Sequence, residues 1–184
     1  VLYCRLLHLV PHFFFSFLMT WVQPLVGHLL SQYAETRLEG LQKLKRMLMD
    51  PEEKCSAANT YVADAGALQA LLAVSAKLSA TQGATSATAT AGQDQRLQEE
   101  SLRVLKLLMD SATGANRMLL ARTLCGRSLF PMIRGGLMDI SEGKLQVTLM
   151  SLSLLASVAR HCPRVVLGRF HGDVPLHLPC FRSQ

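Results

Sequence analysis

Alternation of β-branched and polar residues, which is the pattern of a half-buried strand, is nearly absent from this sequence. Aromatic residues make up only 6% of the chain and charged residues 17%, whereas hydrophobic residues reach 49%. Leu and Ala dominate the hydrophobic set, and folds built on sheets are therefore disfavoured. The composition predicts an all-α domain, and 184 residues are enough to bury a sizeable core.

Paired cysteines are also missing. The five cysteines are odd in number and include no C-x-x-C pair. They are Cys4, Cys55, Cys125, Cys162 and Cys180. This distribution argues against a disulfide framework and favours a reducing compartment. We therefore expect an intracellular protein, either cytoplasmic or nuclear.

Motifs for catalysis or cofactor binding are absent as well. His161, Cys162 and the His and Cys residues nearer the C-terminus offer metal-ligating atoms, but their spacing matches no common zinc pattern. Cys125 has no evident acid partner for a nucleophilic role. Gly135 and Gly136 are not followed by the Lys-Ser/Thr of a phosphate-binding loop. The sequence therefore predicts no catalytic residue, no metal ligand and no cofactor.

No apolar run has the length and uniformity of a membrane-spanning helix. Residues 13–30 carry no formal charge, but Pro24, Gly27 and two polar residues interrupt them, and a span needs about 20 predominantly apolar residues. No small-residue cleavage site marks residues 1–20 as a signal peptide. Three interpretations of this apolar extension stay open: a buried helix, a membrane segment, or sequence foreign to the domain through an incorrect gene model. Membrane contact through residues 1–30 is the least favoured.

From Trp21 onward, leucines spaced by three and four residues predict a series of helices. The first four are expected over residues 22–30, 36–49, 51–66 and 67–78. Asp50 and Pro51 are typical of a helix start, because Asp caps free amide groups and Pro suits the first turn. We expect Gly66 to end the third helix in the left-handed conformation that glycine adopts readily.

Small and polar residues fill the stretch 79–95. It lacks apolar periodicity, so burial cannot offset the entropy lost on ordering. We predict a disordered inserted loop, with a Ser/Thr-rich modification segment as the alternative. Further helices are expected over residues 96–110, 115–124, 129–134, 144–160 and 163–170. Gly126 is expected to close a helix, and the Gly135–Gly136 pair to stop or bend one. Residues 171–184, with two prolines and no periodicity, are expected to form an irregular tail.

The helix expected over residues 144–160 is apolar on nearly all sides. This pattern is typical of a helix enclosed between two neighbours. We predict buried core positions for four leucines across the domain, namely Leu68, Leu71, Leu105 and Leu152.

Leucines also recur at an interval of 61 residues. The interval relates Leu41 to Leu102, Leu44 to Leu105 and Leu68 to Leu129. Without the insert the period falls in the forties, as in armadillo and HEAT repeats. The segments 62–72 and 96–102 look like the openings of armadillo helices, and Pro24 and Pro131 lie where that family often has a proline. Over residues 21–170 the chain thus resembles about three degenerate repeats of the armadillo and HEAT type.

This resemblance implies an all-α, armadillo-like right-handed α-solenoid. It also implies a non-catalytic protein–protein interaction scaffold, since stacked repeats present an extended concave surface to a partner protein. Nuclear-import armadillo proteins hold peptides with regular Trp and Asn pairs. Trp21 is the single Trp of this chain, so the resemblance does not extend to that role.

The net charge of +6 comes entirely from the C-terminal part of the sequence. Ten basic and ten acidic residues cancel through Ser111, and nine basic and three acidic residues follow. Eight of these form a candidate basic interaction surface: Arg117, Arg122, Arg127, Arg134, Lys144, Arg160, Arg164 and Arg169. The simplest interpretation is a solvated surface. The alternative function is a nucleic-acid-associated scaffold, as in ribosome assembly, because a basic surface attracts phosphates.

Overall fold

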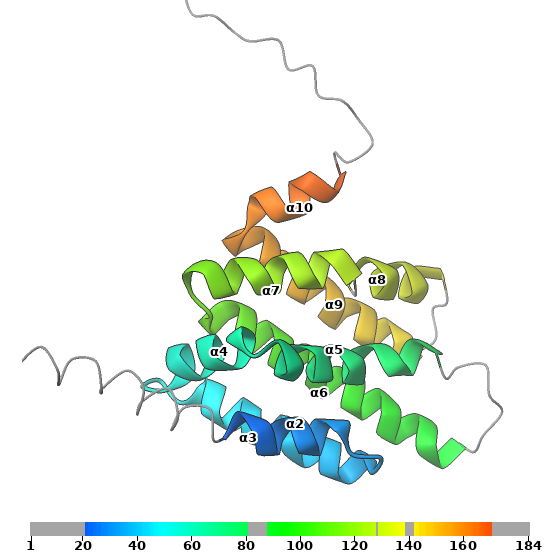
Figure 1. The fold of residues 1–184 in the computed structure, drawn as a ribbon. Helices are drawn as coiled ribbons and strands as arrows, with labels where there is room; N and C mark the ends of the chain where they lie inside the picture. The colour runs from blue at the N-terminus through cyan, green and yellow to red at the C-terminus, as the bar shows by residue number, and fades with distance from the viewer. Residues whose placement is uncertain (1–20, 81–87, 128, 139–141, 171–184) are drawn as a thin grey trace, which may run out of the picture.

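The computed structural model describes residues 21–80, 88–127, 129–138 and 142–170, and within these ranges it contains nine helices and no strands. The all-α prediction is confirmed. The helices are α2 (Val22–Leu30), α3 (Ala34–Met49), α4 (Lys54–Ala63), α5 (Ala65–Ala80), α6 (Thr88–Ser111), α7 (Gly114–Arg127), α8 (Leu129–Met138), α9 (Glu142–His161) and α10 (Pro163–Phe170). They follow one another from α2 and α3 at one end of the molecule to α10 at the other (Figure 1).

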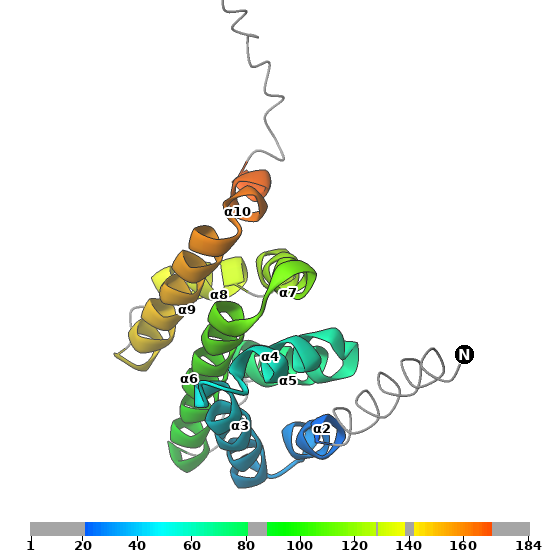
Figure 2. The same ribbon diagram turned by 90° about the vertical axis from the view of Figure 1, so that its left-hand side faces the viewer.

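Helix α6 runs through the middle of the molecule. It packs against α3 and α5 on one side and against α9 on the other, as Figure 2 shows. Apolar residues recur along it every three or four positions, so it presents a buried surface to each neighbour. The buried ones are Leu97, Leu102, Val104, Leu105, Leu108 and Met109. Through them, one hydrophobic core extends from α2 to α9.

The leucine predictions are largely confirmed. Leu68, Leu71 and Leu105 are buried, but the prediction for Leu152 is wrong, because its side chain is 40% exposed. Helix α9 packs against α6, α8 and α10, and Leu152 lies on the side that these described neighbours leave open. Helix α9 does have the neighbours that its apolar pattern indicated, but part of its apolar surface stays exposed.

The junction between α4 and α5 has the expected place but not the expected residue. Helix α4 ends at Ala63, and Asp64 has an extended backbone with φ −82° and ψ 105°. The Asp64 Oδ1 atom accepts a hydrogen bond of 3.0 Å from the Ala67 amide, which caps α5. Gly66 lies inside α5, and the described glycine with positive φ is Gly114. The prediction that Gly66 closes a helix is therefore wrong. The break lies at Asp64, and the carboxylate of Asp64 starts the next helix by accepting the hydrogen bond from Ala67.

The single Trp contributes to packing near this junction. The rings of Trp21 and Tyr61 stack with centroids 6.4 Å apart. The Tyr61 hydroxyl donates a hydrogen bond of 2.9 Å to the Ala67 carbonyl. Burial, followed by the nearby charge of Asp64, raises the pKa of Tyr61 well above its ordinary value. This hydroxyl therefore stays protonated and holds α4 to α5.

The loop expected over residues 79–95 is too long at both ends. Helix α5 continues to Ala80 and α6 already begins at Thr88, so the residues between them, 81–87, lie outside the described part. Alanine is the best helix former, and the Gln95 side chain donates to Glu99 one turn further on, at 3.0 Å. A polar sequence can therefore extend a helix whose later turns are already packed.

The glycines expected as stops lie inside helices instead. Gly126 belongs to α7, and the Gly135–Gly136 pair belongs to α8. A glycine costs a helix interior only about 1 kcal/mol relative to alanine, which packing of α7 and α8 against their neighbours outweighs. The extension of residues 1–20 and the tail of residues 171–184 lie outside the described residues. Among the described helices, none has the length and hydrophobicity needed to cross a membrane.

Candidate interaction surface

The eight basic residues predicted to form a surface are distributed over four helices, α7 to α10. The side chains of Arg122, Arg134, Arg160 and Arg164 are exposed. Those of Arg127, Lys144 and Arg169 lie outside the described part, although their backbones are helical. The sequence therefore located the basic helices, and four of the eight cations are demonstrably open to solvent.

Arg117 has a different environment from the exposed arginines. Its side chain is partly buried, and its Nη2 atom donates to the carbonyl oxygen of Asp110, 3.4 Å away, at the end of α6. Its Nε atom is buried and has no hydrogen-bond partner among the described atoms. A cation beside the last carbonyl groups of a helix is favourable there. Arg117 thus contributes to the junction of α6 with α7 rather than to an open surface.

The exposed arginines do not gather at one point. Arg160 lies in the last turn of α9 and Arg164 in the first turn of α10, so these two lie at the same end of α9. Arg134 belongs to α8, which packs beside the N-terminal half of α9 (Figure 1). A helix of 20 residues is about 30 Å long. The structure therefore brings Arg160 and Arg164 together and leaves Arg134 toward the other end of α9.

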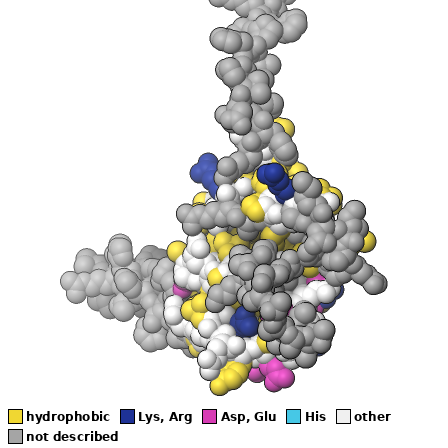
Figure 3. Space-filling view, turned by 90° about the vertical axis from the view of Figure 1, so that its right-hand side faces the viewer, with side chains coloured by type: hydrophobic (Ala, Val, Ile, Leu, Met, Phe, Trp, Pro, Cys, Tyr) yellow, Lys and Arg dark blue, Asp and Glu magenta, His cyan; other side chains and the backbone are white. Residues whose placement is uncertain are grey.

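No carboxylate belongs to the described side chains of α7 to α10. Asp139 and Glu142, the acidic residues of this stretch of the sequence, have side chains outside the described part. In the space-filling view, hydrophobic side chains gather in the upper half of the molecule, with Lys or Arg side chains beside them (Figure 3). The described surface of these helices is accordingly basic and apolar.

The apolar part of this surface is concentrated on α9. Leu145, Leu149 and Leu152 are 46%, 52% and 40% exposed, and Ala156 is exposed in the next turn. Their spacing of four, three and four residues places them in one stripe along the helix. We call these four residues the α9 outer face. Large apolar side chains exposed side by side are a frequent mark of a binding surface.

Hydroxyl groups, by contrast, occupy the inner face of α9. Thr148, Ser151 and Ser157 are all buried. The Ser151 hydroxyl donates to the Val147 carbonyl at 2.9 Å within the helix, so its polar group is satisfied without a partner on α6. Small side chains allow two helices to approach closely. The sequence pattern of α9 misled the burial prediction because leucines occur on both faces of the helix, with Leu154 buried and Leu152 exposed, and two serines share the inner face.

A polar cluster that the sequence did not indicate joins α6 to α9. The Ser157 hydroxyl donates to Oδ1 of Asp110, and His161 Nε2 lies 3.5 Å from the same oxygen. Lys106 Nζ lies 3.1 Å from Oδ2. Burial alone would raise the pKa of the Asp110 carboxyl, but the hydrogen bonds from Ser157 and Lys106 and the charges of Lys106 and His161 outweigh burial and lower it. Asp110 is therefore a stable anion between two helices.

This cluster contains the residue types of a catalytic triad, but its geometry differs. In a triad the base accepts the proton of the serine and the carboxylate orients the base. Here the buried Ser157 donates directly to the carboxylate of Asp110. Nor do the described residues contain a group of three or more His, Cys, Asp or Glu side chains suited to a metal ion. The arrangement holds α6 to α9 and offers no nucleophile.

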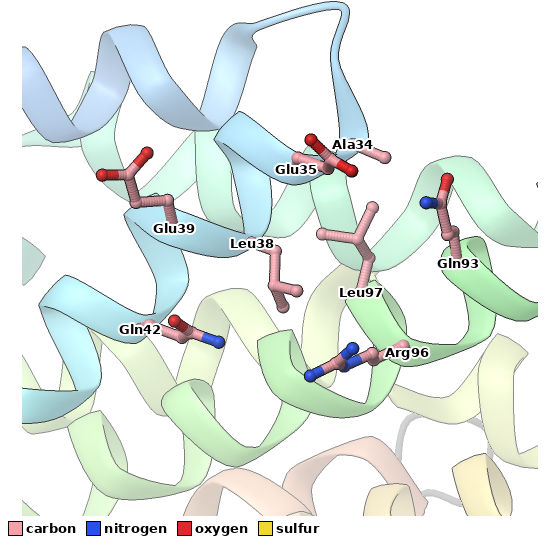
Figure 4. A pocket seen from close by; sticks show the side chains of 8 residues that line it. All are labelled: Ala34, Glu35, Leu38, Glu39, Gln42, Gln93, Arg96 and Leu97. Carbon is pink, nitrogen blue, oxygen red and sulfur yellow. The ribbon is translucent and has the colours of Figure 1, made fainter.

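A second site missed by the sequence analysis is a cleft between α3 and the first turns of α6. Its volume is about 270 Å³, and its walls include Glu35, Leu38, Gln42, Arg96 and Leu97 (Figure 4). The figure shows Arg96 and Leu38 at its centre, with Glu39 turned away. The cleft exists because α6 begins at Thr88, where the sequence predicted a loop. The cleft is open to solvent, and its polar lining consists of one arginine, two glutamines and two glutamates. None of these side chains forms a pair of general acid and general base.

No family model, no curated protein and no solved structure matches this chain. The function therefore has to be argued from the packing of the helices and from the surface of α7 to α10.

Proposed function

We propose that this chain is a non-catalytic protein–protein interaction scaffold, folded as an armadillo-like α-solenoid. The observation that carries the proposal is a regular packing order. Five of the six pairs of described helices that are separated by three positions in the chain lie against each other: α3 against α6, α6 against α9, α4 against α7, α7 against α10, and α2 against α5; α5 and α8 make no comparable contact. In a stack of three-helix repeats, each helix packs on its equivalent in the next repeat.

The interval of 61 residues supports the same division of the chain. It relates leucines of α3 to leucines of α6, and the start of α5 to the start of α8. All six leucines are buried, and they are Leu41, Leu44, Leu68, Leu102, Leu105 and Leu129. On this proposal α4–α6 and α7–α9 are two complete repeats, while α2–α3 and α10 belong to incomplete ones.

A solenoid of this kind acts by presenting a surface. Its repeats hold exposed side chains at fixed spacing, and a partner binds across several helices at once. The basic and apolar surface of α7 to α10 is the best candidate, because exposed leucines and arginines occur together there. Tyr, Trp and Arg provide most hot spots in protein interfaces, and burial of Leu supplies apolar area. The cysteine usage of the sequence is consistent with a cytoplasmic or nuclear scaffold.

The second candidate is a nucleic-acid-associated scaffold. The observation in its favour is the exposure of four arginines without a described carboxylate on the same helices. Against it, the described part of these helices exposes no aromatic side chain for base stacking; Phe130 is half-buried. Three exposed leucines of α9 would also stay in water beside a phosphate backbone. We therefore place protein binding first.

One experiment on the full chain separates the two candidates. RNA and DNA binding is measured at about 50 and 200 mM salt, a range over which phosphate contacts lose affinity steeply. A triple variant, Arg122→Glu, Arg160→Glu and Arg164→Glu, is compared with a matched reversal of exposed cations elsewhere, Lys43→Glu, Arg46→Glu and Lys54→Glu. In parallel, protein fragments that bind the parent are selected from a display library.

We expect protein ligands whose binding is weakened by the first triple variant and not by the matched reversal. Nucleic-acid binding should be weak and equal in both variants. Tight, salt-sensitive RNA or DNA binding that only the first triple variant loses would overturn the protein scaffold in favour of the second candidate.

A further inference from the structure

The α9 outer face lies opposite the side of α9 that contacts α6. Residues of a helix turn by about 100° each, which places Leu149 and Ala156 nearly opposite the buried Ser151, Leu154 and Val158. The stripe is therefore not the rim of the α6 contact. It is a separate face, directed away from the rest of the described core.

This face continues an established series of helix contacts. In the order α3, α6, α9, each helix packs on the one before it, and α6 is covered on both sides. Helix α9 is covered by α6 on one side, whereas Leu145, Leu149 and Leu152 remain exposed on the other. The α9 outer face thus occupies the position at which a further helix of the series would pack.

Each earlier step of the series also includes a carboxylate of α6 that is paired with a side chain of the neighbouring helix. Lys45 of α3 lies 3.1 Å from Glu100 of α6. At the next step Asp110 of α6 receives hydrogen bonds or charge from Ser157 and His161 of α9. Burial alone would raise the pKa of Glu100, but hydrogen bonds and charge from Lys45 and Arg103 outweigh burial and lower it. This lowered pKa is consistent with the pairing of Glu100 and Lys45. Apolar packing therefore occurs together with a paired carboxylate, which faces a lysine at the first step and a serine and a histidine at the second.

Among the described side chains, the outer face of α9 has a cation but no carboxylate. Arg160 is exposed and lies on the same side of the helix as the stripe, four residues beyond Ala156. Arg164 follows in the first turn of α10 and is exposed as well. Since the described side chains of α7 to α10 include no carboxylate, we assign the carboxylate that complements Arg160 to the occupant of this face.

We propose that the α9 outer face binds an acidic amphipathic helix of a partner protein, with apolar side chains over Leu145, Leu149 and Leu152 and a carboxylate against Arg160. The inference rests on the proposed scaffold function and names its partner class. Helix-in-groove recognition of this type uses anchors spaced by three and four residues. A second copy that bound through the same surface of α7 to α10 would bring the same arginines and no described carboxylate. A nucleic acid would leave the leucines uncovered.

The test is a selection from a library of displayed helices, with the full chain as target. Leu is fixed at four positions with spacings of three and four, and the flanking positions vary among Asp, Glu, Ser, Lys and Arg. The targets are the parent, Leu149→Asp, the double variant Arg160→Glu with Arg164→Glu, and Leu30→Asp. Leu30 of α2 is also exposed, so its substitution controls for a new surface charge. Circular dichroism verifies that each target keeps its helical content.

We expect Asp and Glu to be enriched at the flanking positions with the parent and with Leu30→Asp. The double variant should instead enrich Lys and Arg. Leu149→Asp should weaken the selected helices by at least about tenfold, because it places a carboxylate against the apolar side chains of the bound helix.

Two results would overturn the inference. One is enrichment that is independent of charge or equal for the parent and Leu149→Asp. The other is self-association of the parent in sedimentation that Leu149→Asp abolishes, which would make a second copy the occupant. Protein ligands from the unbiased library that bind both variants normally would contradict this inference alone and leave the scaffold proposal intact. Salt-sensitive nucleic-acid binding as the sole activity would contradict the scaffold proposal itself.

Discussion

At the scale of single residues, Leu105 shows how the core depends on α6. Its side chain is completely buried in the middle of the helix that contacts both halves of the molecule. We predict that Leu105→Ala lowers the free energy of unfolding by about 2–5 kcal/mol, through lost burial and the cavity left behind. Urea unfolding measures the loss. Leu152→Ala, at a half-open site on α9, serves as control and should change stability by about 0.5 kcal/mol or less. Equal effects of the two substitutions would contradict the assignment of α9's faces.

Asp110 makes a pH-dependent contribution to the contact between α6 and α9. Its pKa is lowered in the folded protein, so the contribution is fully present above the ordinary carboxyl pKa and is lost as pH falls through the lowered value. We predict that Asp110→Asn is less stable than the parent at neutral pH. The difference should shrink below about pH 4, the ordinary range of an aspartate. Thermal unfolding from pH 7 downward measures it, and parallel curves for parent and variant would contradict the prediction.

At the scale of elements, the first turns of α6 are the sharpest difference from the sequence prediction. Gly92 lies there in a helix, and a Cβ atom added to it would meet no other atom within 4 Å. We predict that Gly92→Ala stabilises the protein by about 0.5–1 kcal/mol, because alanine favours a helix over the unfolded chain. Gly27→Ala in α2, where the added Cβ is also unhindered, is the matched control and should give a similar gain. Denaturant unfolding decides: a gain at Gly27 without one at Gly92 would indicate that residues 88–95 form a loop.

The helices themselves were predictable wherever burial enforces a period. The leucines of α3 and α6 recur at helical spacing because each faces a neighbouring helix, and the sequence located both. Boundaries were harder, since the break at Asp64 depends on a hydrogen bond to Ala67 that glycine statistics do not reveal. The first turns of α6 contain no large apolar residues at helical spacing, so the sequence did not indicate a helix there.

The candidate site was predictable in part for the same reason. Charge is visible in the sequence, so the basic helices α7 to α10 were found. Which face of α9 is open was not visible, because Leu149 and Leu154 look equivalent in a helix that is apolar all round. Only the contacts with α6 distinguish the exposed one from the buried one. Asp110, Ser157 and His161 were missed since they are far apart in sequence and meet only after α6 and α9 pack.

At the scale of the whole molecule, the helices should differ in the free energy needed to open them. Helix α6 packs between α3 and α9, whereas the eight residues of α10 contact α7 and α9 near one end of the molecule. Helices with few neighbours open locally, while those at the centre open only with the whole fold. We predict the slowest backbone hydrogen exchange in α6 and much faster exchange in α10, measured by mass spectrometry of peptides and corrected for intrinsic rates.

Combining this measurement with Leu105→Ala makes the prediction quantitative. If α6 exchanges only through global unfolding, the substitution should accelerate its exchange by the full loss of stability, about tenfold for each 1.4 kcal/mol. Exchange in α10 should change little, because its local opening does not expose Leu105. Equal acceleration in both helices would mean that α10 opens only with the core, and the predicted local opening of α10 would be wrong. Unchanged exchange in α6 despite a large loss of stability would show that α6 opens locally, which its contacts with α3, α5 and α9 argue against.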